Sequence, residues 1–186
     1  ADASKRPLHA TDERLWALLS ALRAGTTPRD LSLQTGIDPW FLERLARIVA
    51  MERRLLSEPL TPELMRAAKR MGFSDVQIGT LADRLTEQVR QQRIGWGIRP
   101  VYKMVDTCAA EFEAYTPYYY STYDRGDDEV KGNTAKKVMI LGGGPNRIGQ
   151  GIEFDYCCVH AAFALKEDGF ETIMVNSNPE TVSTDY

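Results

Sequence analysis

Apolar residues recur at helical spacing through residues 1–100, and most of these runs follow a residue type that caps helices. Thr27-Pro28, Asp38-Pro39 and Thr61-Pro62 each place a capping side chain before a proline, which is tolerated at the first helical position. No stretch in this half alternates apolar and polar residues as a half-buried strand would. The pattern predicts an all-helical domain over residues 1–100. Its six helices are expected to start near Thr11, Thr27, Asp38, Thr61, Ser74 and Thr86, with ends near Gly25, Gly36, Gly72 and Arg93.

In the second half of the chain the pattern changes to strand, helix, strand. Residues 136–141 form a short apolar run followed at once by Gly142-Gly143-Gly144, as expected for a buried parallel strand that enters a tight turn. Residues 152–168 have helical periodicity, and residues 172–175 form a second apolar run. The pattern predicts one βαβ unit. Because a parallel pair of strands cannot bury both of its faces, we expect the chain to be a piece of a longer protein.

Aromatic residues are concentrated between the two halves. Seven of them fall within residues 102–123, where Lys103 is the only cation. An acidic aromatic segment would repel phosphates, which disfavours stacking on nucleic acid. We therefore expect a largely irregular strap with packed rings that covers a neighbouring domain, followed by a polar domain boundary. The predicted organisation is a helical domain over residues 1–100, a tyrosine-rich strap and linker over residues 101–134, and part of an α/β domain over residues 135–186.

Composition and charge are those of an ordinary globular protein. The 186 residues carry 23 basic and 26 acidic side chains, and 43% of them are hydrophobic. No apolar run approaches the roughly 18 residues of a membrane span. Three cysteines without metal-ligand spacing fit reduced thiols in a cytoplasmic protein. The net charge of −3 combines +4 over residues 1–100 with −7 over residues 101–186.

Residues 30–42 have the form of a helix-turn-helix, which gives the alternative hypothesis of a nucleic-acid-binding module. A recognition helix needs Arg, Lys, Asn or Gln at its start to read base edges. Here the second helix starts with Pro39-Trp40-Phe41. A charge of +4 over 100 residues is also modest for such a protein, so helix-on-helix packing is the favoured interpretation.

The glycine-rich turn after the first predicted strand fails both familiar nucleotide motifs. A dinucleotide fingerprint needs a third glycine where Arg147 stands, and an acid near Asn176. A phosphate loop needs Lys-Ser or Lys-Thr where Gln150-Gly151 stands. A free-standing nicotinamide-dependent domain is therefore disfavoured. The turn still lies at the carboxyl end of a strand, where open α/β sheets place ligands, and Glu153 and Glu180 could face that cleft. Glu153 is equally well explained as a favourable acid in the first turn of a helix.

Three blocks of sequence resemble the large subunit of carbamoyl phosphate synthetase. Residues 142–158, GGGPNRIGQGIEFDYCC, resemble the opening of its second synthetase half. Residues 176–186, NSNPETVSTDY, resemble the loop after the second strand of that half, and residues 105–123 resemble the segment just before it. The blocks keep the order and spacing of the family. Residues 1–100 match only in kind, as the variable helical oligomerisation domain.

The resemblance implies a fold class of α plus α/β, in which an all-helical oligomerisation domain precedes the first βαβ unit of a Rossmann-like pre-ATP-grasp domain. It implies that the whole protein is an ATP-dependent ligase that makes carbamoyl phosphate from bicarbonate, two ATP and ammonia released from glutamine. The product would serve arginine or pyrimidine biosynthesis in the cytoplasm. The implied partners are a small glutaminase subunit and further copies bound through the helical domain, with no nucleic acid and no membrane.

The cofactors implied for the full-length enzyme are ATP and Mg²⁺ or Mn²⁺, with K⁺ as a further candidate. None is expected to bind this segment, because the ATP and metal ligands of the family lie in other domains. The segment is therefore expected to contain no catalytic residue and to be inactive alone.

The resemblance also places Gly151, Glu153 and Glu180 along the tunnel through which carbamate reaches the second active site. A glycine leaves width in such a passage, and carboxylates accept hydrogen bonds from an amine or from carbamic acid. The glycine turn itself comprises Gly142, Gly143, Gly144 and Gly149.

Overall fold

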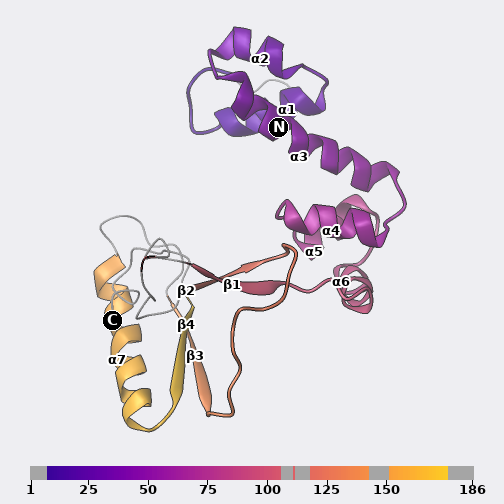
Figure 1. Cartoon of the computed structure of the whole chain (residues 1–186). Helices are drawn as coiled ribbons and strands as arrows, with labels where there is room; N and C mark the ends of the chain where they lie inside the picture. Colours follow the sequence, from indigo (N-terminus) through magenta and orange to yellow (C-terminus); the bar gives the residue numbers. More distant parts are fainter. Residues whose placement is uncertain (1–7, 106–110, 112–117, 143–150, 176–186) are drawn as a thin grey trace. The chain divides into compact units, whose positions relative to one another are not determined.

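A computed structural model describes residues 8–105, 111, 118–142 and 151–175, without the side chains of residues 151–155 (Figure 1). Its contacts divide the chain into two compact units, Ala1–Val130 and Lys131–Tyr186. The helices are α1 (Arg14–Arg23), α2 (Pro28–Thr35), α3 (Pro39–Ser57), α4 (Pro62–Arg70), α5 (Asp75–Leu81), α6 (Thr86–Gly95) and α7 (Gly151–Glu167). The strands are β1 (Val101–Val105), β2 (Tyr118–Thr122), β3 (Lys137–Leu141) and β4 (Glu171–Val175).

The capping residues place the helix starts as predicted in α2 to α5. The Thr27 and Thr61 side chains accept hydrogen bonds from the first turns of α2 and α4. Asp38 does the same for α3, and Ser74 forms a reciprocal capping box at α5. The prediction that a side chain caps the start of α1 is wrong. Thr11 contributes its main-chain carbonyl to that turn, 3.2 Å from the Arg14 nitrogen, and no side chain caps the helix.

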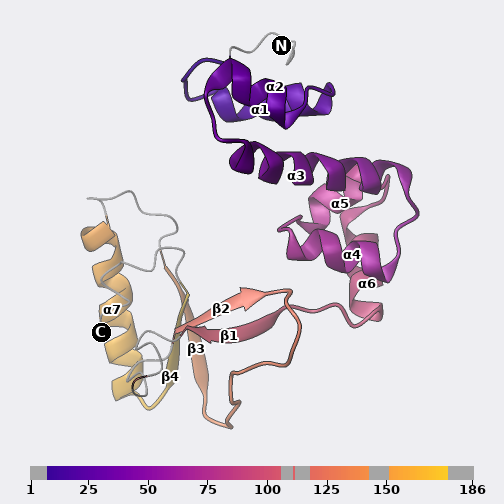
Figure 2. The same ribbon diagram turned by 45° about the horizontal axis from the view of Figure 1, so that its top comes forward.

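The described part of the first unit has two hydrophobic cores, and α3 contributes to both (Figure 2). The amino-terminal half of α3 packs with α1 and α2 through Leu31 and Leu42, which are fully buried. The carboxyl-terminal half packs through Leu55 against α4, α5 and α6, around Met65 and Ile78. A helix of 19 residues is about 28 Å long, enough to reach both cores.

The tyrosine-rich segment contains a β-hairpin, so the prediction of a largely irregular strap is wrong where the structure describes it. β1 and β2 pair antiparallel, with Val101 opposite Thr122 and Val105 opposite Tyr118. Both strands are rich in aromatic and β-branched residues, which favour a pleated surface. Tyr123 packs against the second core, whereas three other rings are 41–51% exposed. These three rings belong to Tyr102, Tyr119 and Tyr120.

The second unit is the predicted βαβ unit. β3 and β4 are parallel neighbours, and α7 connects them and packs against both. Half-buried positions alternate with exposed ones along each strand, and Met139 and Leu141 are 59% and 73% exposed. The prediction that β3 is buried is therefore wrong within this chain, because a single helix covers only one face of the sheet.

Candidate functional site

The carboxyl ends of β3 and β4 meet at one edge of the small parallel sheet. The main-chain nitrogen of Gly142, directly after β3, donates to the carbonyl of Val175 at the end of β4, at 2.8 Å. The chain therefore leaves both strands at the same edge, and this is the edge where open α/β sheets bind ligands. α7 begins at Gly151 and runs back along the strands, so its first turn also lies at this edge (Figure 1).

The structure brings part of the predicted site to this edge. Gly142 lies at the end of β3, Gly151 is the first residue of α7, and Glu153 belongs to the first turn of that helix. The side chain of Glu153 lies outside what the structure describes. The positions of the other predicted residues, in the glycine turn and after β4, also lie outside the described residues. These are Gly143, Gly144, Gly149 and Glu180.

The described side chains offer no candidate metal centre. Among them, no group of three or more His, Cys, Asp and Glu residues could hold a metal ion. The His160 ring stacks edge-on against Tyr156, with ring centroids 4.2 Å apart. Cys157 and Cys158 are free thiols on α7, and Cys157 is exposed. None of the described helices has the length and apolar character needed to cross a bilayer.

The first unit contains a largely buried ion cluster. Asp75, the first residue of α5, accepts from Arg93 of α6 at 2.8 Å and from Lys69 of α4 at 2.9 Å. Arg93 also donates to the main-chain carbonyl of Ile98, at 2.9 Å. The Tyr123 ring lies against both cations, 5.0 Å from the Lys69 nitrogen and 5.6 Å from the Arg93 guanidinium carbon. The cluster joins three helices to the end of β2.

The charges in this cluster compensate one another. Burial raises the pKa of Asp75, but the hydrogen bonds and charges of Arg93 and Lys69 outweigh burial and hold that pKa below its usual value. The bond to Asp75 raises the pKa of Arg93, and burial raises the pKa of Tyr123. A carboxylate held ionised between two cations is a poor general base at neutral pH. We therefore assign the cluster a structural role, which is to fix the hairpin on the helices.

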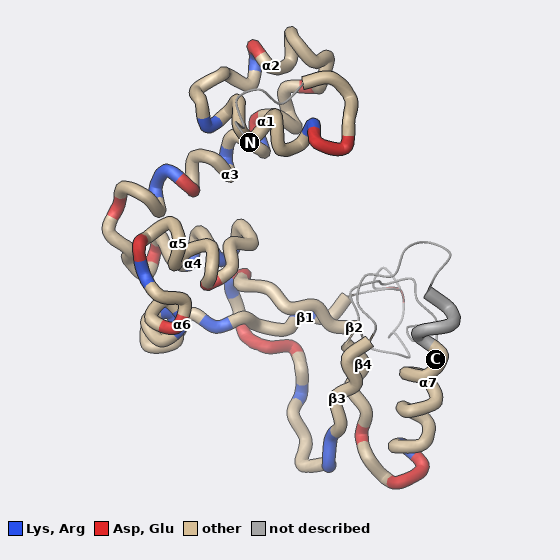
Figure 3. The backbone as a smooth tube through the Cα atoms, turned by 180° about the vertical axis from the view of Figure 1, so that it is seen from behind, with Lys and Arg blue, Asp and Glu red and all other residues tan. Residues whose placement is uncertain are grey.

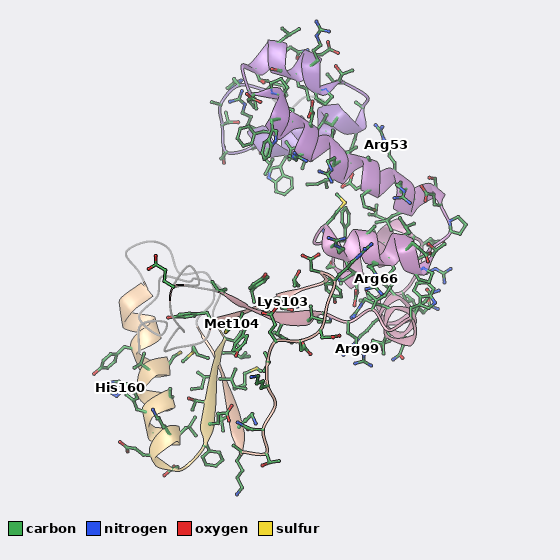
Figure 4. The ribbon with its side chains drawn as sticks, in the orientation of Figure 1. Arg53, Arg66, Arg99, Lys103, Met104 and His160 are labelled. Atoms are coloured by element: carbon green, nitrogen blue, oxygen red, sulfur yellow. The ribbon has the colours of Figure 1, made fainter. Side chains whose placement is uncertain are left out.

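Acidic side chains after the hairpin close the outer edge of β1. The main-chain nitrogens of Tyr102 and Met104 donate to Asp128 and Glu129, both at 2.7 Å. Lys103, labelled in Figure 4, pairs with Glu129 at 3.2 Å. The bond from Met104 and the pairing with Lys103 lower the pKa of Glu129. These polar residues, predicted to mark a domain boundary, thus cover an edge strand that would otherwise expose its hydrogen-bonding groups.

The charges on α3 do not form a nucleic-acid-binding face. Two acidic residues, Glu43 and Glu52, lie among the four arginines of the helix (Figure 3). Arg53 (Figure 4) donates to the main-chain carbonyls of Leu22 and Arg23, at 3.1 and 3.2 Å. Arg54 pairs at 2.8 Å with Glu58, which directly follows α3. These cations are used within the fold, so the helix-turn-helix alternative gains no support from the structure.

The helices followed by a βαβ unit define a mixed protein of α and α/β parts. Residues 2–97 match the family model of the oligomerisation domain of the carbamoyl-phosphate synthetase large chain, and residues 134–186 match the model of the carbamoyl phosphate synthase preATP-grasp domain. The chain belongs to the carbamoyl phosphate synthetase large-chain family. This confirms the resemblance stated from the sequence.

Curated relatives agree with this assignment over the whole chain. The carbamoyl phosphate synthase large chain of Kineococcus radiotolerans is 57% identical over 188 residues, covering 100% of this chain and 17% of the relative. The large chain of a Nostoc species is 57% identical, and the match covers 94% of this chain and 16% of the relative. The large chain of Methanothermobacter thermautotrophicus is 55% identical, and the match covers 95% of this chain and 17% of the relative. The chain thus spans about a sixth of the length of these relatives.

Proposed function

We propose that this chain is a segment of the large subunit of a glutamine-dependent carbamoyl phosphate synthetase. In that enzyme it would mediate contacts between subunits and form part of the carbamate tunnel. The observation that carries the proposal is the succession of two family matches in one chain, the oligomerisation domain and then the pre-ATP-grasp domain. The whole enzyme would use ATP with Mg²⁺ or Mn²⁺, K⁺ as a further ion, and a small glutaminase subunit that releases ammonia in the cytoplasm. The extents that we propose are a helical domain over residues 1–100, a tyrosine-rich linker with the β1–β2 hairpin over residues 101–134, and part of an α/β domain over residues 135–186.

The edge formed by β3, β4 and α7 suits a passage for a small substrate. Gly142 directly follows β3 there and Gly151 begins α7, so neither position carries a Cβ atom. In the Rossmann-like arrangement that we propose for the complete domain, Glu153 and Glu180 would flank the passage. Two carboxylates would repel a bare carbamate anion. The substrate would therefore travel protonated or screened by a cation.

Carboxylate variants test the tunnel role in an enzyme that contains this segment in place of the matching segment of the Kineococcus relative. Glu153→Ala and Glu180→Ala are expected to raise the ATP consumed per carbamoyl phosphate formed, because carbamate is lost between two working half-reactions. Glu167→Ala, at the far end of α7, is the matched control and should leave the ratio unchanged. If both tunnel variants keep the control's ratio and rate, the tunnel assignment is wrong.

The isolated chain is expected to make no carbamoyl phosphate and to bind ATP negligibly. Calorimetric titration of the chain with ATP and Mg²⁺ measures this. Binding at about 10 μM or tighter, roughly −7 kcal/mol, would contradict the assignment of the nucleotide sites to other domains.

A further inference from the structure

The first two turns of α3 present two aromatic rings and an arginine to solvent. Trp40 and Phe41 are 53% and 59% exposed, and their rings meet edge-on with centroids 5.0 Å apart. The guanidinium carbon of Arg44 lies 4.6 Å from the centre of the Trp40 ring. We call Trp40, Phe41 and Arg44 the aromatic end of α3. Single exposed apolar residues are ordinary on protein surfaces, but Trp, Phe and Arg are the residue types enriched in the buried centres of interfaces.

The packing of α3 against the other described residues does not account for these rings. Leu42 and Val49 carry the inward face of this half of the helix into the core with α1 and α2. The outward face continues from Trp40 through Glu43 to Arg47, all of them exposed. Residues three and four apart lie on one side of a helix, so the rings adjoin a surface with charges of both signs. This surface is self-complementary in charge.

We propose that the aromatic end of α3 is the centre of a two-fold self-association surface, and that its occupant is the same surface of a second copy of the chain. The inference rests on the proposed assembly function of residues 1–100, whose family model describes an oligomerisation domain. In a two-fold contact the same patch is used on both copies. With the axis perpendicular to α3 near residues 43 and 44, Glu43 of one copy faces Arg44 of the second copy, and Trp40 faces its Arg47.

The size of the patch fits the centre of an interface rather than all of it. A buried aromatic side chain contributes about 150–250 Å², so two rings that are half exposed offer roughly 200 Å² on each copy. A standard interface buries about 800 Å² per partner. The rings therefore cover about a quarter of one side, and the remaining area comes from the polar positions around them, as in interfaces with an apolar centre and a polar rim.

The self-association of the 186-residue chain tests the proposal. Light scattering on a sizing column over a concentration series gives the mass and the dissociation constant. Trp40→Gln with Phe41→Gln is expected to raise the dissociation constant at least 30-fold, as loss of a central aromatic contact does. Leu56→Gln is the matched control, because Leu56 lies on the same helix and is 64% exposed, away from the patch. Thermal melts followed by circular dichroism verify that both variants keep the helical fold.

A charge swap tests the geometry of the contact. Glu43→Arg and Arg44→Glu are each expected to raise the dissociation constant about tenfold by placing like charges together across the axis. The double variant should recover most of that loss. Adjacent residues do not face each other within one helix, so a recovery has to come from contacts between copies.

The outcomes separate the surface from the assembly role. Self-association of the unaltered chain and of Leu56→Gln, lost in the aromatic double variant, supports the proposal. If the chain self-associates and the aromatic variant does so equally well, this surface is wrong while the assembly function stands. If the unaltered chain is monomeric at every concentration, both the surface and the proposed assembly function of this chain are overturned.

Discussion

Removing the negative charge at Asp75 is expected to destabilise the first unit strongly. Asp75→Asn keeps the size of the side chain but leaves Lys69 and Arg93 without their anion, and the three side chains are only 16%, 8% and 10% exposed. Breaking a buried ion pair from one side costs about 3–5 kcal/mol. The remaining exposure lets water replace part of the lost interaction, so we expect a loss of about 2–4 kcal/mol.

The measurement is the free energy of unfolding in urea, followed by circular dichroism at 222 nm. Asp124→Asn is the matched control, because it makes the same chemical change in a pair with Arg70 whose side chains are 58% and 46% exposed. An exposed pair contributes about 0–1 kcal/mol, so this variant should be nearly as stable as the parent chain. If Asp75→Asn costs less than about 1 kcal/mol, or no more than the control, the cluster does not fix the hairpin on the helices as we conclude.

Three further predictions follow from particular contacts. Because the pKa of Asp75 is lowered in the folded state, its contribution to stability should be fully present at neutral pH and should shrink progressively as pH falls below the unfolded pKa of about 4. A stability difference between Asp75→Asn and the parent that does not decrease between about pH 5 and pH 2 would contradict this. Gly79→Ala should destabilise the fold by about 1–3 kcal/mol, because the added Cβ atom would lie 2.7 Å from a main-chain oxygen. Gly95→Ala has open space around the added atom, so it should be neutral or stabilise the fold by up to about 1 kcal/mol. Equal melting temperatures of the two variants would refute the packing argument. Thr61→Ala should lower the free energy of unfolding by about 1 kcal/mol, because the side-chain cap of α4 is lost. Thr11→Ala should lower it much less, because no side chain caps α1. Urea titration of both variants measures the two losses, and equal losses would contradict the cap assignment.

The helices were predictable because their boundaries depend on neighbouring residues. Thr27-Pro28 and Thr61-Pro62 fix both the capping oxygen and the first helical φ angle, so three or four residues suffice to locate a start. Thr11 has the same residue type, yet its side chain caps nothing, because its main-chain carbonyl closes the turn before α1. The presence of α1 was therefore predictable, but its cap was not.

Features that depend on distant pairings were missed. The hairpin needs Val101 to meet Thr122, and the dense tyrosines suggested a strap although aromatic and β-branched residues also favour strands. Asp75 and Arg93 are 18 residues apart, and an aspartate at the start of a helix is expected on local grounds alone. Nothing in the local pattern indicated that two cations from other helices would converge on it.

The candidate site was predictable only in part. The apolar run that ends at Leu141 located the strand, and the parallel pairing places the end of this strand beside that of β4. The roles of Gly151, Glu153 and Glu180 came from resemblance to the family, since a glycine and two acids carry no specific signal of a tunnel. These roles remain proposals to be tested in an intact enzyme.

The central claim is that this chain supplies an assembly and tunnel segment of a carbamoyl phosphate synthetase. The most direct measurement is glutamine-dependent carbamoyl phosphate formation by the Kineococcus large chain in which this chain replaces the matching 188 residues. The account predicts that the hybrid assembles with its glutaminase subunit and forms product with the same ATP consumption per carbamoyl phosphate as the parent enzyme. A correctly folded hybrid that forms no carbamoyl phosphate, although both of its half-reactions proceed, would contradict the account.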